Sequence, residues 1–278
     1  MGNLLSAGFV RLWKSKVFWL FCAFLMGGTL ISIWTRYRDG VQYGYHSNLD
    51  TAFMYYVVFI AILIPLVCGL FIGTDYTGGA IRNKVICGHS KAKVYLSNLT
   101  VCSAASLIMC TFAVVPGLAM GLPLLGGFAM GRTRAILFFV AVYALALAWT
   151  ALFTMLAMLL NRRIAAMLLA LALLAAGAYL EGRLEARPTI QGLVVTTVDS
   201  LTNITDTTFE EYPNPRYLPE GPVRDVFQFL SDFTPGGQTL QHVNQRANRL
   251  DLLMAYDVVL FALTTGVGVA LFKRKDLK

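Results

Sequence analysis

Six long apolar stretches, separated by polar or charged segments, dominate the sequence. They run from Val17 to Trp34, Ala52 to Gly73, Leu99 to Ala119, Ala135 to Leu160, Ile164 to Leu180 and Leu252 to Phe272. A helix rises ~1.5 Å per residue, so roughly 20 apolar residues cross a hydrocarbon core ~30 Å thick. The pattern predicts an all-α integral membrane protein with six transmembrane helices in a single transmembrane domain, residues 1–278.

Composition agrees with this pattern. Of the 278 residues, 57% are hydrophobic and 14% are charged, which leaves too little polar surface for a soluble fold of this length. The first stretch is not followed by a small-x-small cleavage site, so we expect it to remain as a membrane helix.

The basic residues predict the orientation of the chain. They form four clusters: Arg11, Lys14 and Lys16; Arg82, Lys84, Lys91 and Lys93; Arg162 and Arg163; and Lys273, Arg274, Lys275 and Lys278. All four fall on one side of the membrane if both termini are cytoplasmic, as the positive-inside rule requires. Arg132 and Arg134 would then lie outside. The clusters also account for the net charge of +8, because basic residues on one side orient a membrane protein, and no nucleic-acid partner is expected. We expect a multi-pass protein of a bacterial cell membrane.

The segments between the stretches divide the chain further. Residues 1–16 place Leu5, Phe9 and Leu12 at helical spacing, which predicts an interfacial helix. Spans one to five occupy 17–180, with a polar insert at 75–98 after the second span. Residues 181–251 form one long extracytoplasmic loop, and 252–272 form span six. Within the loop we expect a strand from Leu193 to Val198 and a helix after Pro222, ended by Pro235-Gly236-Gly237.

Several motifs of enzymes are missing. The sequence has no G-x-x-x-x-G-K-[ST] phosphate loop, no H-E-x-x-H and no G-x-S-x-G, so we expect no catalytic residue, no metal site and no cofactor in this chain. None of the five cysteines lies in the long outer loop, and no disulfide framework is predicted.

Asp257 is the one acidic residue inside a predicted span, and Pro65 breaks the backbone bonding of the second span. A carboxylate within a span must face protein or water. It either pairs with a Thr, a Tyr or an arginine such as Arg132 or Arg134, or it contacts a cationic substrate or a transported proton. Pro65 is either an ordinary helix kink or part of a pathway wall.

The insert contains a short helix, Ala80 to Cys87, with Ile81 and Val85 on one face and Arg82 and Asn83 off that face. We expect Ile81 and Val85 to be exposed. They would then lie on the bilayer surface or in an apolar groove of a partner protein.

The run from Asp75 to Lys91, DYTGGAIRNKVICGHSK, resembles the segment that follows the second span in permease subunits of the ATP-binding-cassette type-2 exporter family. The family pattern is approximately D-x-x-x-G-x-I-R-N-K-[IVL]-x-x-G-x-[ST]-[KR]. The resemblance implies a coupling helix that docks onto an ATPase subunit. The residues that it implies for this contact are Asp75, Ile81, Arg82, Asn83, Lys84 and Val85.

The same resemblance implies that ATP and Mg²⁺ are bound by separate ATPase chains and that a second permease copy, identical or a close paralogue, completes the exporter. Two other functions remain open. An ion-coupled transporter would use Asp257 as its ion site. A sensor or immunity complex would bind an extracellular peptide through the long outer loop without transporting it. The substrate is not encoded in any motif of the chain.

Overall fold

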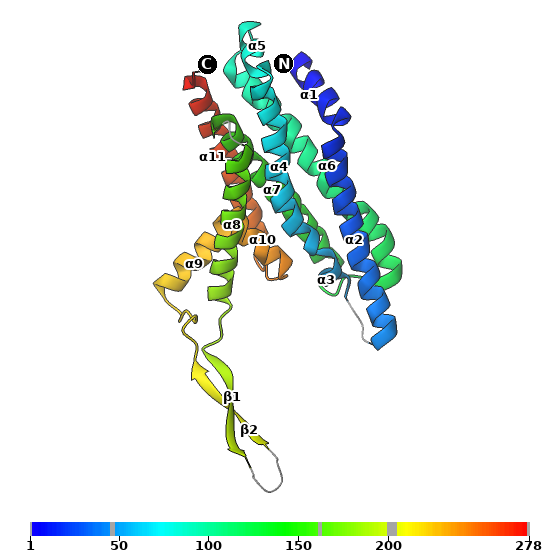
Figure 1. Cartoon of the computed structure of the whole chain (residues 1–278), viewed down its shortest axis with the longest axis vertical. Coiled ribbons are helices and arrows are strands. Elements are labelled where there is room, and N and C mark those ends of the chain that lie inside the picture. Colours follow the sequence, from blue (N-terminus) through cyan, green and yellow to red (C-terminus); the bar gives the residue numbers. More distant parts are fainter. Residues whose placement is uncertain (1, 45–47, 161–162, 199–204, 277–278) are drawn as a thin grey trace.

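The computed structural model describes residues 2–44, 48–160, 163–198 and 205–276. Arg162 and Lys278, two members of the basic clusters, lie outside the described residues. The chain forms an elongated helix bundle with a β-hairpin projecting from one end (Figure 1). Both termini lie at the opposite end. We call these the hairpin end and the termini end.

Among the described residues, six helical segments are long and apolar enough to cross a membrane. They comprise α2 (Lys16–Tyr43), α3 with α4 (Leu49–Phe53 and Tyr55–Thr77), α6 (Lys91–Leu125), α7 (Arg132–Leu160), α8 (Arg163–Leu184) and α11 (Leu250–Arg274). The predicted class of a helical membrane protein with six spans is therefore supported. Most of these helices extend beyond the predicted apolar stretches, because polar residues near the interface continue the same helix.

The centre of the bundle is formed by α4 and α7, both largely buried. Trp149 and Phe153 of α7 stack with their ring centroids 5.4 Å apart, and both side chains are fully buried. Pro65 lies in the buried part of α4, inside a continuous helix. Its predicted place in a pathway wall stays a prediction.

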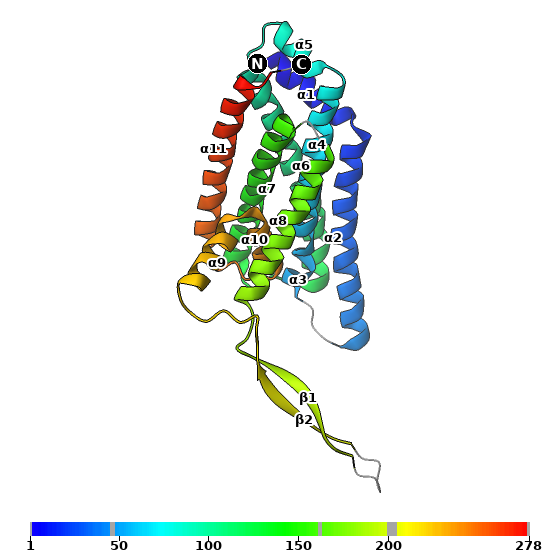
Figure 2. The same cartoon turned by 60° about the vertical axis from the view of Figure 1, so that its left-hand side comes forward.

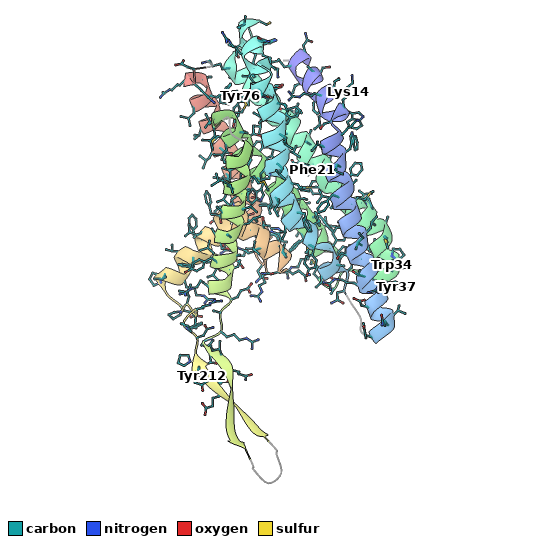
Figure 3. The ribbon with its side chains drawn as sticks, in the orientation of Figure 1. Lys14, Phe21, Trp34, Tyr37, Tyr76 and Tyr212 are labelled. Carbon is teal, nitrogen blue, oxygen red and sulfur yellow. The ribbon has the colours of Figure 1, made fainter. Side chains whose placement is uncertain are left out.

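α1 (Gly2–Lys14) is a separate helix that packs against α6 at the termini end, with Leu4 and Leu12 buried (Figure 2). Ser15 ends it and caps α2, because the Ser15 hydroxyl accepts a hydrogen bond from the Phe18 amide at 3.3 Å. Trp13 remains exposed beside this junction. Trp34 and Tyr37 lie near the other end of α2 (Figure 3), so aromatic side chains mark both ends of this span.

The long segment after α8 is more structured than the sequence indicates. Two antiparallel strands, β1 (Thr189–Val198) and β2 (Thr205–Pro213), form the hairpin, with Thr189 opposite Pro213. The predicted strand thus exists and has a partner. Then follow the amphipathic helix α9 (Pro222–Phe233) and the helix α10 (Pro235–Val243).

The predicted helix after Pro222 is α9, and it ends at Phe233, just before Pro235-Gly236-Gly237, as expected; the sequence pattern does not predict the new helix α10, which begins at Pro235. Thr234 is an N-cap whose hydroxyl accepts from the Gly237 amide at 3.3 Å, and Pro235 occupies the first helical turn, where a missing N–H has no cost. The glycines permit close packing. A Cβ on Gly236 would overlap the carbonyl of Leu173 in α8, and one on Gly177 would lie 2.7 Å from the Gly237 nitrogen. α10 therefore packs into the bundle against α8, α4 and α7.

Candidate functional site

A short helix, α5 (Ala80–Ile86), connects α4 to α6 at the termini end (Figures 1 and 2). Gly79 before it and Gly88 after it have φ values of 67° and 87°, a backbone region that glycine enters without steric cost. Ser90 then caps α6 by accepting from the Lys93 amide. A tight turn therefore precedes α5 and another follows it.

The expected exposure of Ile81 and Val85 is wrong. Ile81 is 1% exposed, and Val85 is partly buried against the same apolar core. α5 folds back onto α4 and α6, so the chain itself covers the apolar side of this helix. An amphipathic pattern shows which side is apolar, but it does not show what covers that side.

Asp75 and Lys84, which the resemblance implies as partner contacts, bind within the chain. Asp75 is 2% exposed and forms ion pairs with Arg11 of α1 and with Lys84 of α5, the latter at 2.8 Å. Burial lowers the pKa of Lys84, and the nearby Arg11 charge lowers it further. One buried carboxylate therefore joins α1, α4 and α5.

Other residues of α5 are available to a partner. Arg82 and Asn83 are exposed, and Ile86 is 71% exposed. We call Arg82, Asn83 and Ile86 the α5 face. Cys87, just beyond it, is an exposed free cysteine. Ile86 was not among the predicted site residues, because the family pattern has a variable position there.

At the termini end, two lysine side chains donate hydrogen bonds to the last backbone carbonyls of neighbouring helices. The Lys91 ammonium donates to the carbonyls of Lys273 and Lys275, at 3.1 and 2.6 Å. Lys275 in turn donates to the carbonyls of Met158 and Leu159, both at 2.9 Å. These carbonyls end α11 and α7, where a positive charge is favoured by the helix dipole. The tyrosine hydroxyl of Tyr76, labelled in Figure 3, donates to the same Met158 carbonyl.

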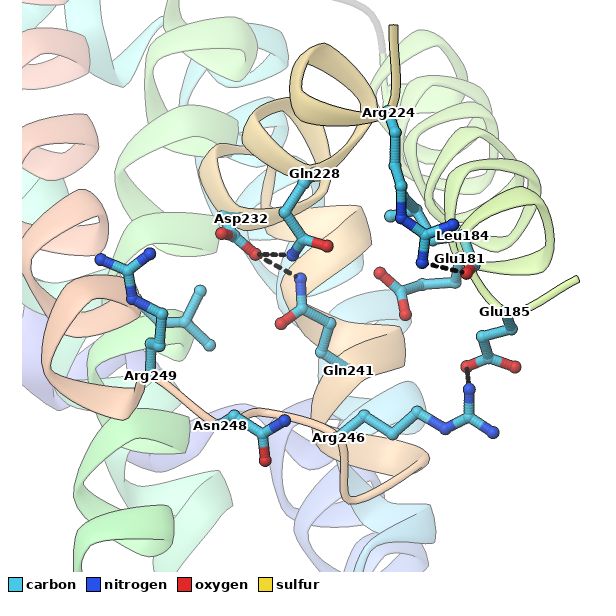
Figure 4. A pocket seen from close by; sticks show the side chains of 11 residues that line it. Glu181, Leu184, Glu185, Arg224, Gln228, Asp232, Gln241, Arg246, Asn248 and Arg249 are labelled. Atoms are coloured by element: carbon cyan, nitrogen blue, oxygen red, sulfur yellow. Dashed lines mark hydrogen bonds and ion pairs between the residues drawn. The ribbon is translucent and has the colours of Figure 1, made fainter. Parts of the chain in front are cut away.

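The hairpin end holds a polar cavity of about 410 Å³ between α8, α9, α10 and the start of α11 (Figure 4). Its side chains include Glu181, Glu185, Arg224, Gln228, Asp232, Gln241, Arg246 and Arg249. The Asp232 carboxylate accepts from the amides of Gln228 and Gln241, both at 2.8 Å. Glu181 accepts from Ser231, whose hydroxyl also accepts from Gln241 at 2.9 Å. One network thus links α8 to α9 and α10.

Two of the arginines that line this cavity, Arg224 and Arg246, bind groups of the chain itself. Arg224 donates to the carbonyls of Leu218 and Leu184, at 2.8 and 3.0 Å, and Arg246 pairs with Glu185 at 2.7 Å. Within the described ranges, no ion pair neutralises Glu181 or Asp232, which are 6% and 8% exposed. The cavity is therefore lined by two buried carboxylates whose hydrogen bonds come from neutral donors. Sequence reasoning missed this site, because its members come from segments up to seventy residues apart.

His242 fixes α10 beneath this cavity. Its Nδ1 lies 2.7 Å from the Gln238 carbonyl, and its ring meets Phe138 edge-on at 4.8 Å. Burial lowers the pKa of His242 to about 4, so the imidazole is neutral at physiological pH. Trp149 adds a second attachment by donating to the Thr239 hydroxyl at 3.2 Å.

Asp257 lies in α11 and is 2% exposed. The predicted pairing with a Thr, a Tyr or an arginine such as Arg132 or Arg134 does not occur among the described residues, and Arg134 donates to the Asn248 side chain at 3.0 Å instead. Both carboxylate oxygens of Asp257 have no hydrogen-bond partner among the described residues. Gln238 is its polar neighbour, but the Gln238 amide nitrogen donates to the Asp232 carbonyl at 2.8 Å. That leaves Oε1 of Gln238 without a donor as well.

A small apolar cavity of about 140 Å³ adjoins Asp257 between α7 and α11, lined by Ala144, Leu147, Val258 and Phe261. The carboxyl group therefore lies beside the Gln238 side chain and adjoins a cavity with apolar walls. No group of three or more His, Cys, Asp and Glu residues suited to a metal ion occurs in the part of the chain that the structure describes.

Comparison with known proteins adds no family assignment. No protein-family model matches this chain, and no curated protein sequence matches it.

Proposed function

We propose that this chain is the membrane-spanning permease subunit of an ATP-driven exporter, as its resemblance to the ATP-binding-cassette type-2 family implies. In this proposal ATP and Mg²⁺ are bound by separate ATPase chains, and a second permease copy, identical or paralogous, completes the translocation pathway. The observation that most supports this proposal is the α5 face. It lies on a short helix between the second and third spans, at the same end as both termini, and its residues Arg82, Asn83 and Ile86 are exposed.

The internal contacts of α5 support a coupling role. A partner that moves α5 acts on Asp75 through Lys84, and on α1 through the shared carboxylate. The buried side chain of Ile81 attaches α5 to the bundle. Force on a seven-residue helix would therefore reach α4, the most buried span, without first breaking a solvent-exposed contact.

Orientation follows from the basic clusters. With the termini end in the cytoplasm, α5 faces the compartment that contains ATP, and the hairpin faces outward. The 410 Å³ cavity at the hairpin end would then be an extracytoplasmic site for substrate or for a regulatory ligand.

The test is docking of an ATPase chain encoded beside this one. Replacing Arg82 by Glu and Ile86 by Asp changes exposed residues, so folding should be unaffected. The double variant should insert normally, yet lose co-purification with the ATPase or lose ATP-driven flux, because exposed interface anchors carry most binding energy. The matched control is Arg187→Glu with Ile190→Asp, which makes the same charge change on exposed residues at the hairpin end.

Undiminished docking, ATP hydrolysis and transport in the α5 double variant would remove the main support for an exporter. Reconstitution in vesicles separates the other functions. ATP hydrolysis stimulated by an extracellular peptide without flux would indicate a sensor or immunity complex. Flux driven by an ion gradient without ATP would indicate a secondary transporter.

A further inference from the structure

A groove of about 430 Å³ lies between α1, the first turns of α2 and the last turns of α4 at the termini end. Its walls are mainly apolar and include Phe18, Phe21, Leu70 and Phe71. Phe21 lies five residues into α2, about 7.5 Å from its start at ~1.5 Å rise per residue. The groove thus begins where a span enters the bilayer and extends toward the hydrocarbon region.

Basic side chains border the same groove. Lys14 is exposed at its rim, and Figure 3 shows Lys14 and Phe21 following one another along this side of the molecule. Arg11 also lines it, with its guanidinium 3.6 Å from the centre of the Phe71 ring. An apolar cleft with cations at one end matches an amphiphile whose head is negative.

The charges around Arg11 are not balanced. Asp75 is shared by Arg11 and Lys84, so one carboxylate serves two cations. Nη1 of Arg11 contacts Asp75, whereas Nε and Nη2 are buried and have no acceptor among the described residues. Burial lowers the pKa of Arg11, which fits a cation that lacks full compensation. A further anion beside the Arg11 side chain would supply the missing negative charge.

We propose that this groove binds an anionic phospholipid of the bilayer leaflet at the termini end. The phosphate accepts from Arg11 and Lys14, and an acyl chain lies along Phe18, Phe21 and Leu70. The bound lipid holds α1 against α4 and neutralises the excess charge around Asp75. This proposal rests on the six-span membrane assignment and does not depend on the exporter function.

The test uses the purified chain in neutral detergent and three added probes: phosphatidylglycerol, phosphatidylcholine with the same acyl chains, and inorganic phosphate. Thermal unfolding and native mass spectrometry report binding. Phosphatidylglycerol should raise the unfolding temperature and give a bound adduct, whereas phosphatidylcholine and phosphate should do neither. Equal effects of the two lipids, or an effect of phosphate alone, would overturn the proposal.

Variants locate the site. Lys14→Glu reverses the rim charge and should weaken phosphatidylglycerol binding about tenfold. Leu70→Trp fills the groove without changing charge and should abolish the adduct. Lys93→Glu is the matched control, because Lys93 is an exposed lysine at the same end that does not line the groove. If Lys14→Glu binds like the unmodified chain, or if Lys93→Glu weakens binding equally, the lipid is not in this groove. That conclusion holds even if Leu70→Trp fails to fold.

Discussion

Asp75 and Asp257 are equally buried, each 2% exposed, but the Asp75 carboxylate is paired with cations and the Asp257 carboxylate is not. Asp75, at the termini end of α4, pairs with two cations from two other helices. Asp257, near the hairpin end of α11, forms no ion pair and no hydrogen bond through its carboxylate among the described residues. Removing a carboxylate from water is costly unless it is paired, so the two positions have different physical roles.

The comparison shows that the charged groups at the two ends of the molecule differ in whether they are paired within the chain. At the termini end, Asp75 forms its ion pairs with residues of the same chain. The residues exposed to a partner there are those of the α5 face, Arg82, Asn83 and Ile86. At the hairpin end Asp257 lies beside Gln238, and neither the Asp257 carboxylate nor Oε1 of Gln238 has a hydrogen-bond partner among the described residues. The two ion pairs give Asp75 a role in stability, whereas the unpaired carboxyl group of Asp257 contributes no such contact.

The largest expected effect is that of Asp75→Asn. This change leaves Arg11 and Lys84 without their counter-charge. It should cost about 3 kcal/mol, the lower end for a buried pair, because the side chains of Arg11 and Lys84 are 35% and 25% exposed and water screens part of their charge. Thermal unfolding in detergent measures the loss. Asp276→Asn, an exposed aspartate at the same end, should unfold like the unmodified chain. A stable Asp75→Asn protein would show that the ion pairs are not an anchor.

Acid should weaken the hairpin end through His242. Its pKa is lowered to about 4 in the folded chain, from 6.5 when unfolded, so the neutral form is stabilised by folding. The unfolded state binds more protons between these values, and stability is fully present above pH 6.5 and is lost as the pH falls toward 4. The loss should reach about 3 kcal/mol. Unfolding curves from pH 7 to 4 test this, and His242→Gln should reduce the slope. An unchanged slope would assign the acid sensitivity to other groups.

The hairpin end also depends on close backbone packing. In Gly236→Ala the new methyl group would overlap the Leu173 carbonyl, and α10 should shift away from α8 at a cost of about 1–3 kcal/mol. Gly182→Ala in α8 is the control, since a Cβ there meets no atom within 4 Å. If both variants unfold at the same temperature, α10 does not pack against α8 as described.

Asp257→Asn should not destabilise the chain, because no ion pair or hydrogen bond is lost and a neutral amide replaces a buried, unpaired carboxyl group. This result beside a strongly destabilised Asp75→Asn would sharpen the contrast between the two aspartates. A purely structural Asp257 also predicts transport with an unchanged pH dependence in the variant. Loss of that pH dependence would identify the carboxyl group as one that titrates during the cycle.

Some of this architecture can be predicted from sequence, for physical reasons. Apolar runs of about twenty residues have few alternatives to spanning a bilayer, so the six helices follow directly. Local turn chemistry similarly places α5 between Gly79 and Gly88. Contacts between distant segments cannot be read in this way. The pairing of Arg11 with Asp75 and the burial of Ile81 depend on how α1, α4, α5 and α6 meet in space.

The hairpin end was the least predictable region. A Pro-Gly-Gly run is typical of a helix end, yet Thr234 caps a new helix there, and the two glycines permit contact with α8. The cavity residues Glu181 and Asp232 carry no motif, because a hydrogen-bond network formed by three separate helices leaves no fixed spacing.

Cross-linking from Cys87 shows whether the α5 face docks onto an ATPase, as proposed. Cys87 is exposed beside this face, and the other four cysteines are buried, so a thiol-reactive photo-cross-linker should attach there without any substitution. In native membranes it should label only from the cytoplasmic side and capture the ATPase chain. A Cys87→Ser, Glu211→Cys variant, which moves the probe to the base of the hairpin, should not capture it. Failure to capture an ATP-binding chain from Cys87, or equal capture from position 211, would contradict the account.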